Sequence, residues 1–256
     1  MLSILALSAL HLAHLKPDHD PSYLDQAITL HNAALSKGSP ALSNITTENG
    51  ENLYLFATLT CFFALGRPRQ AGEFLLEGDT GLAEWLVMFR GTRTVAESLD
   101  QTSLYTGPLG PIFAEGARRA FLQFSAPTQV DHLWMLQHVI NDTTSNRDER
   151  TVYNLTIDGL RQAFNLVYNQ NTHPIESSDV FVWLYRASDE YLVLLGQRKP
   201  EALAIFGYFC VLLKKFDAMW WVHGLAEYFI SQIHNVLNES HRLWINWPMK
   251  EIGWIP

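Results

Sequence analysis

The sequence predicts an all-α fold, a single compact domain over residues 1–256 with about ten to twelve helices of ordinary length. Nearly every long segment places apolar residues three or four positions apart, which is the spacing of one helix face. Alternation of period two is almost absent, and the one strand-like stretch, "VFVWLY", is short and isolated. No linker is long or low in complexity, so one domain is expected rather than two.

Glycines and prolines divide the first two thirds of the chain into helical segments. The first segment stops at Pro17, and the second ends at Gly38. The third, closed by Gly66, is apolar on nearly every side, so we expect it at the centre of the core. The polar stretch 67–80 and "TGPLGPI" separate the later segments. Helices are expected over residues 1–16, 22–38, 81–99, 112–124, 128–140 and 147–170, and residues 39–68 are expected to form a short turn of helix and then the strongly apolar helix.

The last third predicts two helices that meet at Pro200, which a first helical turn tolerates, and then one long amphipathic helix. That helix is expected over "KKFDAMWWVHGLAEYFISQI", residues 214–233, with Gly224 in its middle. A glycine inside a helix costs roughly 1 kcal/mol relative to alanine, so something has to approach the backbone there. Two interpretations stay open: a crossing helix packs on Gly224, or an apolar ligand lies over it beside the adjacent tryptophans.

Composition and charge exclude several functions. The formal net charge of -8 is opposite to the basic footprint that nucleic acid requires, so no direct nucleic-acid binding by this chain is expected. Cys61 and Cys210 lie in apolar runs and are expected as buried thiols, without a disulfide or a metal. His11 and His14 share a helix face, but the acidic stretch 18–20 lies past the helix end and closes no ligand set. No metal site is therefore predicted.

The sequence also indicates where the protein is found. No apolar run reaches the roughly 18 to 20 residues of a membrane span. The first segment could be mistaken for a signal peptide, but it lacks the basic start that such peptides carry. We therefore expect no membrane span and an intracellular protein, in the nucleus or the cytoplasm.

Motifs for catalysis are scarce, and no cofactor is expected. Asn141, Ser145 and Glu149 have the order and spacing of the magnesium-ligand triad of class I terpene cyclases, whose oxygens would align on one continuous helix. The stretch "NDTTSN" forms helices poorly, however, and is better suited to ending one helix and capping the next, with Ser145 or Asn146 as N-cap. No G-x-S-x-G, P-loop, dinucleotide fingerprint or H-E-x-x-H is present.

Five stretches, in order, resemble one family: "LALSALHLAHLKP", "HNAALSKGSPALSNITTEN", "EWLVMFRGTRTV", "SDEYLVLLGQRKPEALAIFGYFCVLL", and "WWVHGLAEYFISQI" followed by "WINWP". They are similar to the C-terminal regulatory domain of fungal zinc-binuclear-cluster transcription factors of the sterol-uptake-control type. The resemblance covers nearly the whole chain. It implies an all-helical domain, often self-associating, that holds a sterol or similar lipid in an apolar pocket and so controls transcription.

The resemblance also indicates candidate site residues. Its tryptophan-glycine block lies near the ligand pocket, and aromatic residues of the preceding helix are expected as pocket walls because they are close in sequence. The residues expected to bind ligand are Trp220, Trp221, Gly224, Phe206, Tyr208 and Phe209. Arg90, Gly91 and Arg93 match an "RG-x-R" block, which we interpret as helix packing and a surface charge pair.

One departure from the family bears on function. The DNA-reading half of such factors needs six closely spaced cysteines for two zinc ions, and this chain has two distant ones. The first hypothesis is therefore a regulatory module that binds an apolar, sterol- or terpenoid-like ligand, as a monomer or as a homodimer, and reaches DNA through a partner. The alternative is an enzyme of fungal specialised metabolism, a cyclase or pericyclase that uses the same pocket to fold a terpenoid or polyene. The sequence favours the first.

Overall fold

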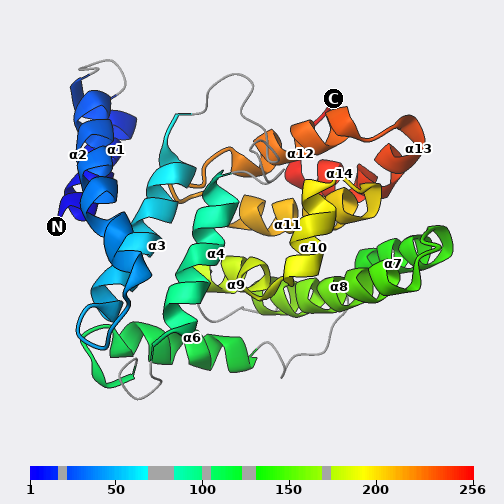
Figure 1. Cartoon of the computed structure of the whole chain (residues 1–256). Coiled ribbons are helices and arrows are strands. Elements are labelled where there is room, and N and C mark those ends of the chain that lie inside the picture. Colours follow the sequence, from blue (N-terminus) through cyan, green and yellow to red (C-terminus); the bar gives the residue numbers. More distant parts are fainter. Residues whose placement is uncertain (17–21, 69–83, 100–104, 123–130, 169–173) are drawn as a thin grey trace. The chain divides into compact units, whose positions relative to one another are not determined.

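A computed structural model describes residues 1–16, 22–68, 84–99, 105–122, 131–168 and 174–256 (Figure 1). Within these ranges the regular secondary structure is helical throughout, so the predicted all-α fold is confirmed. The chain divides into two compact units. Unit 1 holds the described residues of Met1–Glu73 and Glu84–Glu115, and unit 2 those of Gly116–Pro256. The expectation of a single domain stays a prediction.

Unit 1 is built around α3. Its helices are α1 (Leu2–Leu15), α2 (Ser22–Gly38), α3 (Gly50–Gly66) and α4 (Glu84–Glu97), with a short 3-10 helix, η1 (Ser39–Ser43). The α3 helix packs against α1, α2 and α4, and it buries Leu53, Cys61 and Phe63, as its apolar sequence predicts. Phe56 of α3 also covers Gly38 so closely that a Cβ atom there would come within 2.5 Å of the ring.

Unit 2 is built around α11. Its helices, listed in order, are α7 (Asp131–Thr143), α8 (Arg147–Tyr168), α9 (Ser177–Arg186), α10 (Asp189–Gly196), α11 (Pro200–Lys215), α12 (Leu225–Val236), α13 (Glu239–Arg242), η2 (Leu243–Ile245) and α14 (Asn246–Ile252). The α6 helix (Gly110–Leu122) contributes residues to both units. Every residue of α11 from Ala202 to Leu213 is buried, and the helix packs against α8, α10, α12 and α14.

Local sequence explains where several of these helices begin. Pro200 is the first residue of α11, as predicted, because a first-turn position needs no amide donor. The strand-like "VFVWLY" belongs to α9, which starts with a capping box in which Glu176 and Asp179 satisfy each other's backbone N–H. The α8 helix is capped by Asn146, whose Oδ1 accepts the N–H groups of Asp148 (2.9 Å) and Glu149 (3.3 Å).

The prediction of one long helix over residues 214–233 is wrong. The α11 helix ends at Lys215, α12 begins at Leu225, and residues 216–224 form turns. The apolar face that the amphipathic pattern predicts is nevertheless present within α12, where Ala226, Phe229 and Ile233 are buried.

Candidate functional site

Gly224 has a different role from the one that its sequence context predicts. It is the N-cap of α12, with φ of 69° and ψ of 5°, in the left-handed region. An L-residue in this conformation brings its Cβ too close to a carbonyl oxygen, whereas glycine has no Cβ. Gly224 therefore does not lie in the middle of a helix, as both interpretations of this glycine had assumed. Its backbone conformation explains the glycine.

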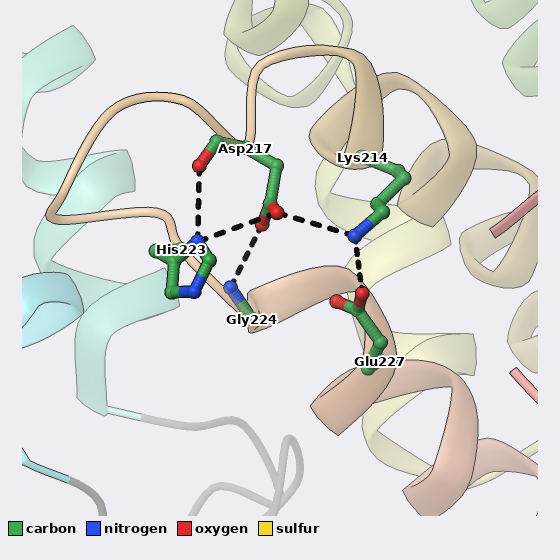
Figure 2. A network of polar contacts seen from close by, with 5 residues as sticks. All are labelled: Lys214, Asp217, His223, Gly224 and Glu227. Atoms are coloured by element: carbon green, nitrogen blue, oxygen red, sulfur yellow. Dashed lines mark hydrogen bonds and ion pairs between the residues drawn. The ribbon is translucent and has the colours of Figure 1, made fainter. Parts of the chain in front are cut away.

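The α11–α12 connection is held by the carboxylate of Asp217. Figure 2 shows this side chain between the backbone of Gly224 and the side chains of Lys214 and His223. Oδ1 accepts the N–H of Gly224 at 2.8 Å, and Oδ2 lies 3.2 Å from Lys214 Nζ and 3.3 Å from His223 Nδ1. Lys214 also pairs with Glu227 in the first turn of α12. One carboxylate thus joins the end of α11 to the start of α12.

The electrostatics of this network favour the ionised forms of Asp217 and Lys214. Burial acts to raise the pKa of Asp217, but the hydrogen bond from Gly224 and the interactions with Lys214 and His223 outweigh it, so the pKa lies below its ordinary value. The hydrogen bond to Glu227, with further contributions from Asp217, raises the pKa of Lys214. At neutral pH the connection is therefore held by charge-assisted hydrogen bonds.

The two adjacent tryptophans lie in different surroundings. Trp221 is buried; its ring stacks on Phe181 of α9, with centroids 5.6 Å apart, and meets the edge of Phe216 at 5.8 Å. Trp220 is only half-buried, and Met219 before it is 40% exposed. The turn therefore directs one tryptophan into the core of unit 2 and leaves the other nearer its surface.

An aromatic cluster connects most of the predicted wall residues. Phe206 and Phe209 are fully buried, with ring centroids 5.4 Å apart. Phe209 lies 4.8 Å from Trp183 and 6.2 Å from Phe181, which in turn stacks on Trp221. We call these five residues the aromatic cluster. It joins α9 and α11 to the α11–α12 connection.

Tyr208, which was expected beside its neighbours, belongs to another part of unit 2. Its ring lies 5.2 Å from that of Trp247, and its hydroxyl donates to the backbone oxygen of His132 at 3.3 Å. Burial raises the pKa of Tyr208. Residues 206 and 209 are three apart and share one face of α11, whereas residue 208 lies on a different face. Nearness in sequence was thus a poor guide to the environment of Tyr208.

Sequence reasoning also missed residues that the structure brings to this place. Phe181 and Trp183 were noticed only as part of a strand-like run, although their aromatic rings complete the cluster. The sequence did not predict a role for Asp217 or Lys214. An acidic residue just after a helix end, seven positions before a glycine, is the signal that could have indicated the connection, but that spacing alone is weak.

The three residues with the spacing of a magnesium-ligand triad do not share a helix. Asn141 lies in α7, Ser145 lies in the break before α8, and Glu149 lies in the first turn of α8. The side chain of Asn141 accepts a hydrogen bond from Asn154 (2.7 Å), and Glu149 pairs with Lys199 (3.1 Å). The interpretation in which "NDTTSN" ends one helix and caps the next is confirmed, because such sequences favour caps.

The remaining candidates divide between confirmed and unsupported interpretations. Arg93 forms the predicted charge pair, with Glu97 at 2.5 Å. Among the described residues, a Cβ on Gly91 would meet nothing within 4 Å, so close packing by any of the described helices does not explain that glycine. Cys61 and Cys210 are buried free thiols, as predicted, and burial raises the pKa of Cys61 to about 12.

The described residues offer neither a metal site nor a membrane span. Within the ranges given above, no group of three or more His, Cys, Asp and Glu side chains could hold a metal ion. Residues 18–20, considered beside His11 and His14, lie outside the described residues. Among the described helices, none combines the length and the hydropathy that crossing a bilayer requires.

Comparison with known proteins relates the chain to fungal transcription factors. It is similar to a "Zn(2)-C6 fungal-type transcription factor" of Gibberella zeae, with 24% identity over an alignment of 266 residues. The alignment covers 97% of this chain and 52% of the relative, so the chain spans about half the length of that protein. No protein-family model matches the chain, and no solved structure matches it.

Proposed function

We propose that this chain is an effector-binding regulatory module of the kind found in sterol-responsive fungal zinc-cluster transcription factors. Its effector is an apolar molecule of sterol or terpenoid type, and it works in the nucleus or the cytoplasm. The observation that carries this proposal is the similarity along 97% of the chain to half of a Zn(2)-C6 factor. These 256 residues contain two cysteines, both buried, and so do not form a six-cysteine zinc cluster. The similarity therefore supports a role in regulation rather than DNA reading by these residues.

The aromatic cluster supports an apolar effector. Its rings are buried and contributed by three segments, so a ligand that inserts among them exchanges ring contacts for ligand contacts. Trp221 belongs both to the cluster and to the α11–α12 connection. A movement of the Trp221 ring would also displace Gly224 and Asp217, which lie three and four residues away along the turn. An effector that favours one arrangement of this connection shifts its population by its differential affinity.

Binding of a defined probe tests the proposal. Ergosterol and farnesol, added to the purified chain, are expected to raise the midpoint of thermal unfolding and to quench or shift tryptophan fluorescence. Mass spectrometry is expected to recover both probes unchanged. Phe209→Leu keeps an apolar side chain but removes a ring of the cluster, so it should lower the affinity roughly 10-fold, the equivalent of about 1.4 kcal/mol. Tyr208→Phe, outside the cluster, is the matched control and should bind normally.

The outcomes separate the candidate functions. If neither ergosterol nor farnesol binds, the regulatory proposal is contradicted. If Phe209→Leu and Tyr208→Phe lose the same affinity, the aromatic cluster is not the binding site. Recovery of a cyclised product would favour the enzyme alternative. The magnesium-dependent form of that alternative has less support, because the residues of its proposed magnesium triad are distributed over two helices and the break between them.

A further inference from the structure

Tyr153 of α8 is a buried tyrosine with an unused hydroxyl. The residue is 0% exposed, and its hydroxyl oxygen has no hydrogen-bond partner among the described residues. Such a group has given up its hydrogen bonds to water without replacing them, so it destabilises the folded chain. Native proteins contain few buried polar groups of this kind. A ligand that completes the hydrogen bonds of Tyr153 would offset this cost.

The polar groups beside Tyr153 are satisfied within the chain. The Tyr191 hydroxyl donates to the backbone oxygen of Ala202 at 3.0 Å, and Trp183 Nε1 donates to the backbone oxygen of Thr156 at 3.0 Å. Thr156 follows Tyr153 by three positions on α8, so both residues lie on the same side of that helix. The hydroxyl of Tyr153 therefore lies on the side of α8 that meets Trp183, a member of the aromatic cluster.

Tyr191 also connects Tyr153 to the cluster. Its ring lies 5.8 Å from that of Trp183. Burial raises the pKa of Tyr191, and Tyr153 adds to this increase, so the two hydroxyls are close enough to interact. Burial also raises the pKa of Tyr153, with smaller contributions from Glu201 and Glu149. The Tyr153 hydroxyl therefore keeps its proton at neutral pH and can donate it in a hydrogen bond.

We infer that Tyr153 is the polar contact of the effector site, where its hydroxyl hydrogen-bonds the hydroxyl of an apolar alcohol whose hydrocarbon part lies among the rings of the aromatic cluster. The inference rests on the proposed function and adds the group that selects among apolar molecules. Small-molecule sites are mostly apolar and carry a few placed polar groups that fix orientation and specificity. A site built around a buried hydrogen bond rejects a ligand that lacks the matching group.

The surroundings of Tyr153 favour a neutral alcohol over an acid. Glu201 and Glu149 both act on the Tyr153 hydroxyl in the direction that negative charges do. They would repel a carboxylate placed there in the same way. A hydroxyl group carries no charge and can both accept from Tyr153 and donate to it.

Two ligands that differ in the hydroxyl group test the inference on the intact chain. Farnesol carries the hydroxyl, and farnesene is a hydrocarbon with the same carbon count. Tyr153→Phe removes only the phenolic oxygen, so it should weaken farnesol binding about 10-fold and leave farnesene binding unchanged in a tryptophan fluorescence titration. Tyr191→Phe removes a hydroxyl that is already bonded within the chain. It is the matched control and should leave the ratio of the two affinities unchanged.

The titration separates this inference from the proposed function. If both ligands bind and Tyr153→Phe changes neither affinity, or lowers both equally, the inference is overturned and the proposed function stands. If neither ligand binds, the proposed function fails and the inference fails with it.

Thermal unfolding of the ligand-free chain gives a test that needs no ligand. Tyr153→Phe removes a buried group that has no partner, so the midpoint of unfolding should stay the same or rise. Tyr191→Phe breaks the hydrogen bond to Ala202 and should lower the midpoint. If Tyr153→Phe lowers the midpoint as much as Tyr191→Phe does, the Tyr153 hydroxyl is already satisfied in the folded chain, and the inference is overturned.

Discussion

Replacing Asp217 should show how the α11–α12 connection is held. Asp217→Ala removes the acceptor for the Gly224 N–H and the charge that faces Lys214 and His223. Asp217→Asn removes the charge but keeps a side-chain oxygen where Oδ1 lies. The two variants therefore separate the backbone hydrogen bond from the ion pairs.

The expected losses in the free energy of unfolding follow from how far Asp217 and its partners are buried. Asp217 is only 18% exposed, so its hydrogen bond from Gly224 is shielded from water and should contribute about 1.5–3 kcal/mol, as bonds to charged groups do. Lys214 and His223 are 32% and 66% exposed, and ion pairs with such partners contribute less than about 1 kcal/mol. We expect Asp217→Ala to lower the free energy of unfolding by about 2–4 kcal/mol and Asp217→Asn by about 1 kcal/mol.

Guanidinium unfolding at pH 7, followed by far-UV circular dichroism, measures both values. The slope of the unfolding free energy against denaturant concentration should be the same for the variants and the original chain. The midpoint alone then reports the change in stability. Equal destabilisation by Asn and Ala would mean that the ion pairs, and not the backbone hydrogen bond, hold the turn. If neither variant changes the free energy by more than about 0.5 kcal/mol, the network does not stabilise the connection.

Three further predictions concern single positions. Gly224→Ala should cost about 1–2 kcal/mol because its φ is positive. Gly91→Ala should instead stabilise by about 0.5–1 kcal/mol, because Gly91 lies inside α4 and no described residue would come within 4 Å of its Cβ. Thermal or denaturant unfolding of both variants compares them, and loss of stability in both would refute the backbone argument. Arg119→Met leaves the buried carboxylate of Asp179 without its partner at 2.6 Å and should cost about 3–5 kcal/mol. Adding Asp179→Asn should restore part of that loss in the same assay, and no restoration would show that the charge is not the cause. Because the folded pKa of Asp217 lies below 3.8, its stabilisation is complete above that pH and is lost as the pH falls through the folded value. The unfolding free energy of the intact chain should therefore decrease more steeply than that of Asp217→Asn below about pH 4, and parallel pH profiles would contradict this assignment.

Much of the fold follows from short-range patterns in the sequence. Apolar spacing predicts most of the helices, since burying one face is what stabilises a helix in a globular protein. The start of α11 at Pro200 and the break before α8 at Asn146 follow from the backbone preferences of those residues. Burial of Cys61 and Cys210 follows from their apolar neighbours. These features depend on residues within a few positions of one another.

The candidate site was less predictable. The six expected ligand residues include three that the structure places in one aromatic cluster, Phe206, Phe209 and Trp221, while Tyr208 lies elsewhere. The other rings of the cluster come from α9, more than twenty residues away along the chain. Spacing along one segment predicts which residues share its face, but it does not predict which other segment covers that face.

The stretch "WWVHG" separates the two kinds of information most clearly. By itself the sequence determined that apolar residues recur here at helical spacing and that a glycine interrupts them. Only the tertiary structure decided that the chain turns at this point, because Gly224 adopts a left-handed conformation whose N–H is satisfied by Asp217, seven residues earlier. The same turn buries Trp221 against Phe181 of α9. Local periodicity cannot distinguish this turn from a continuous helix, because the hydrogen bond and the ring contact that stabilise it form only when the surrounding helices pack.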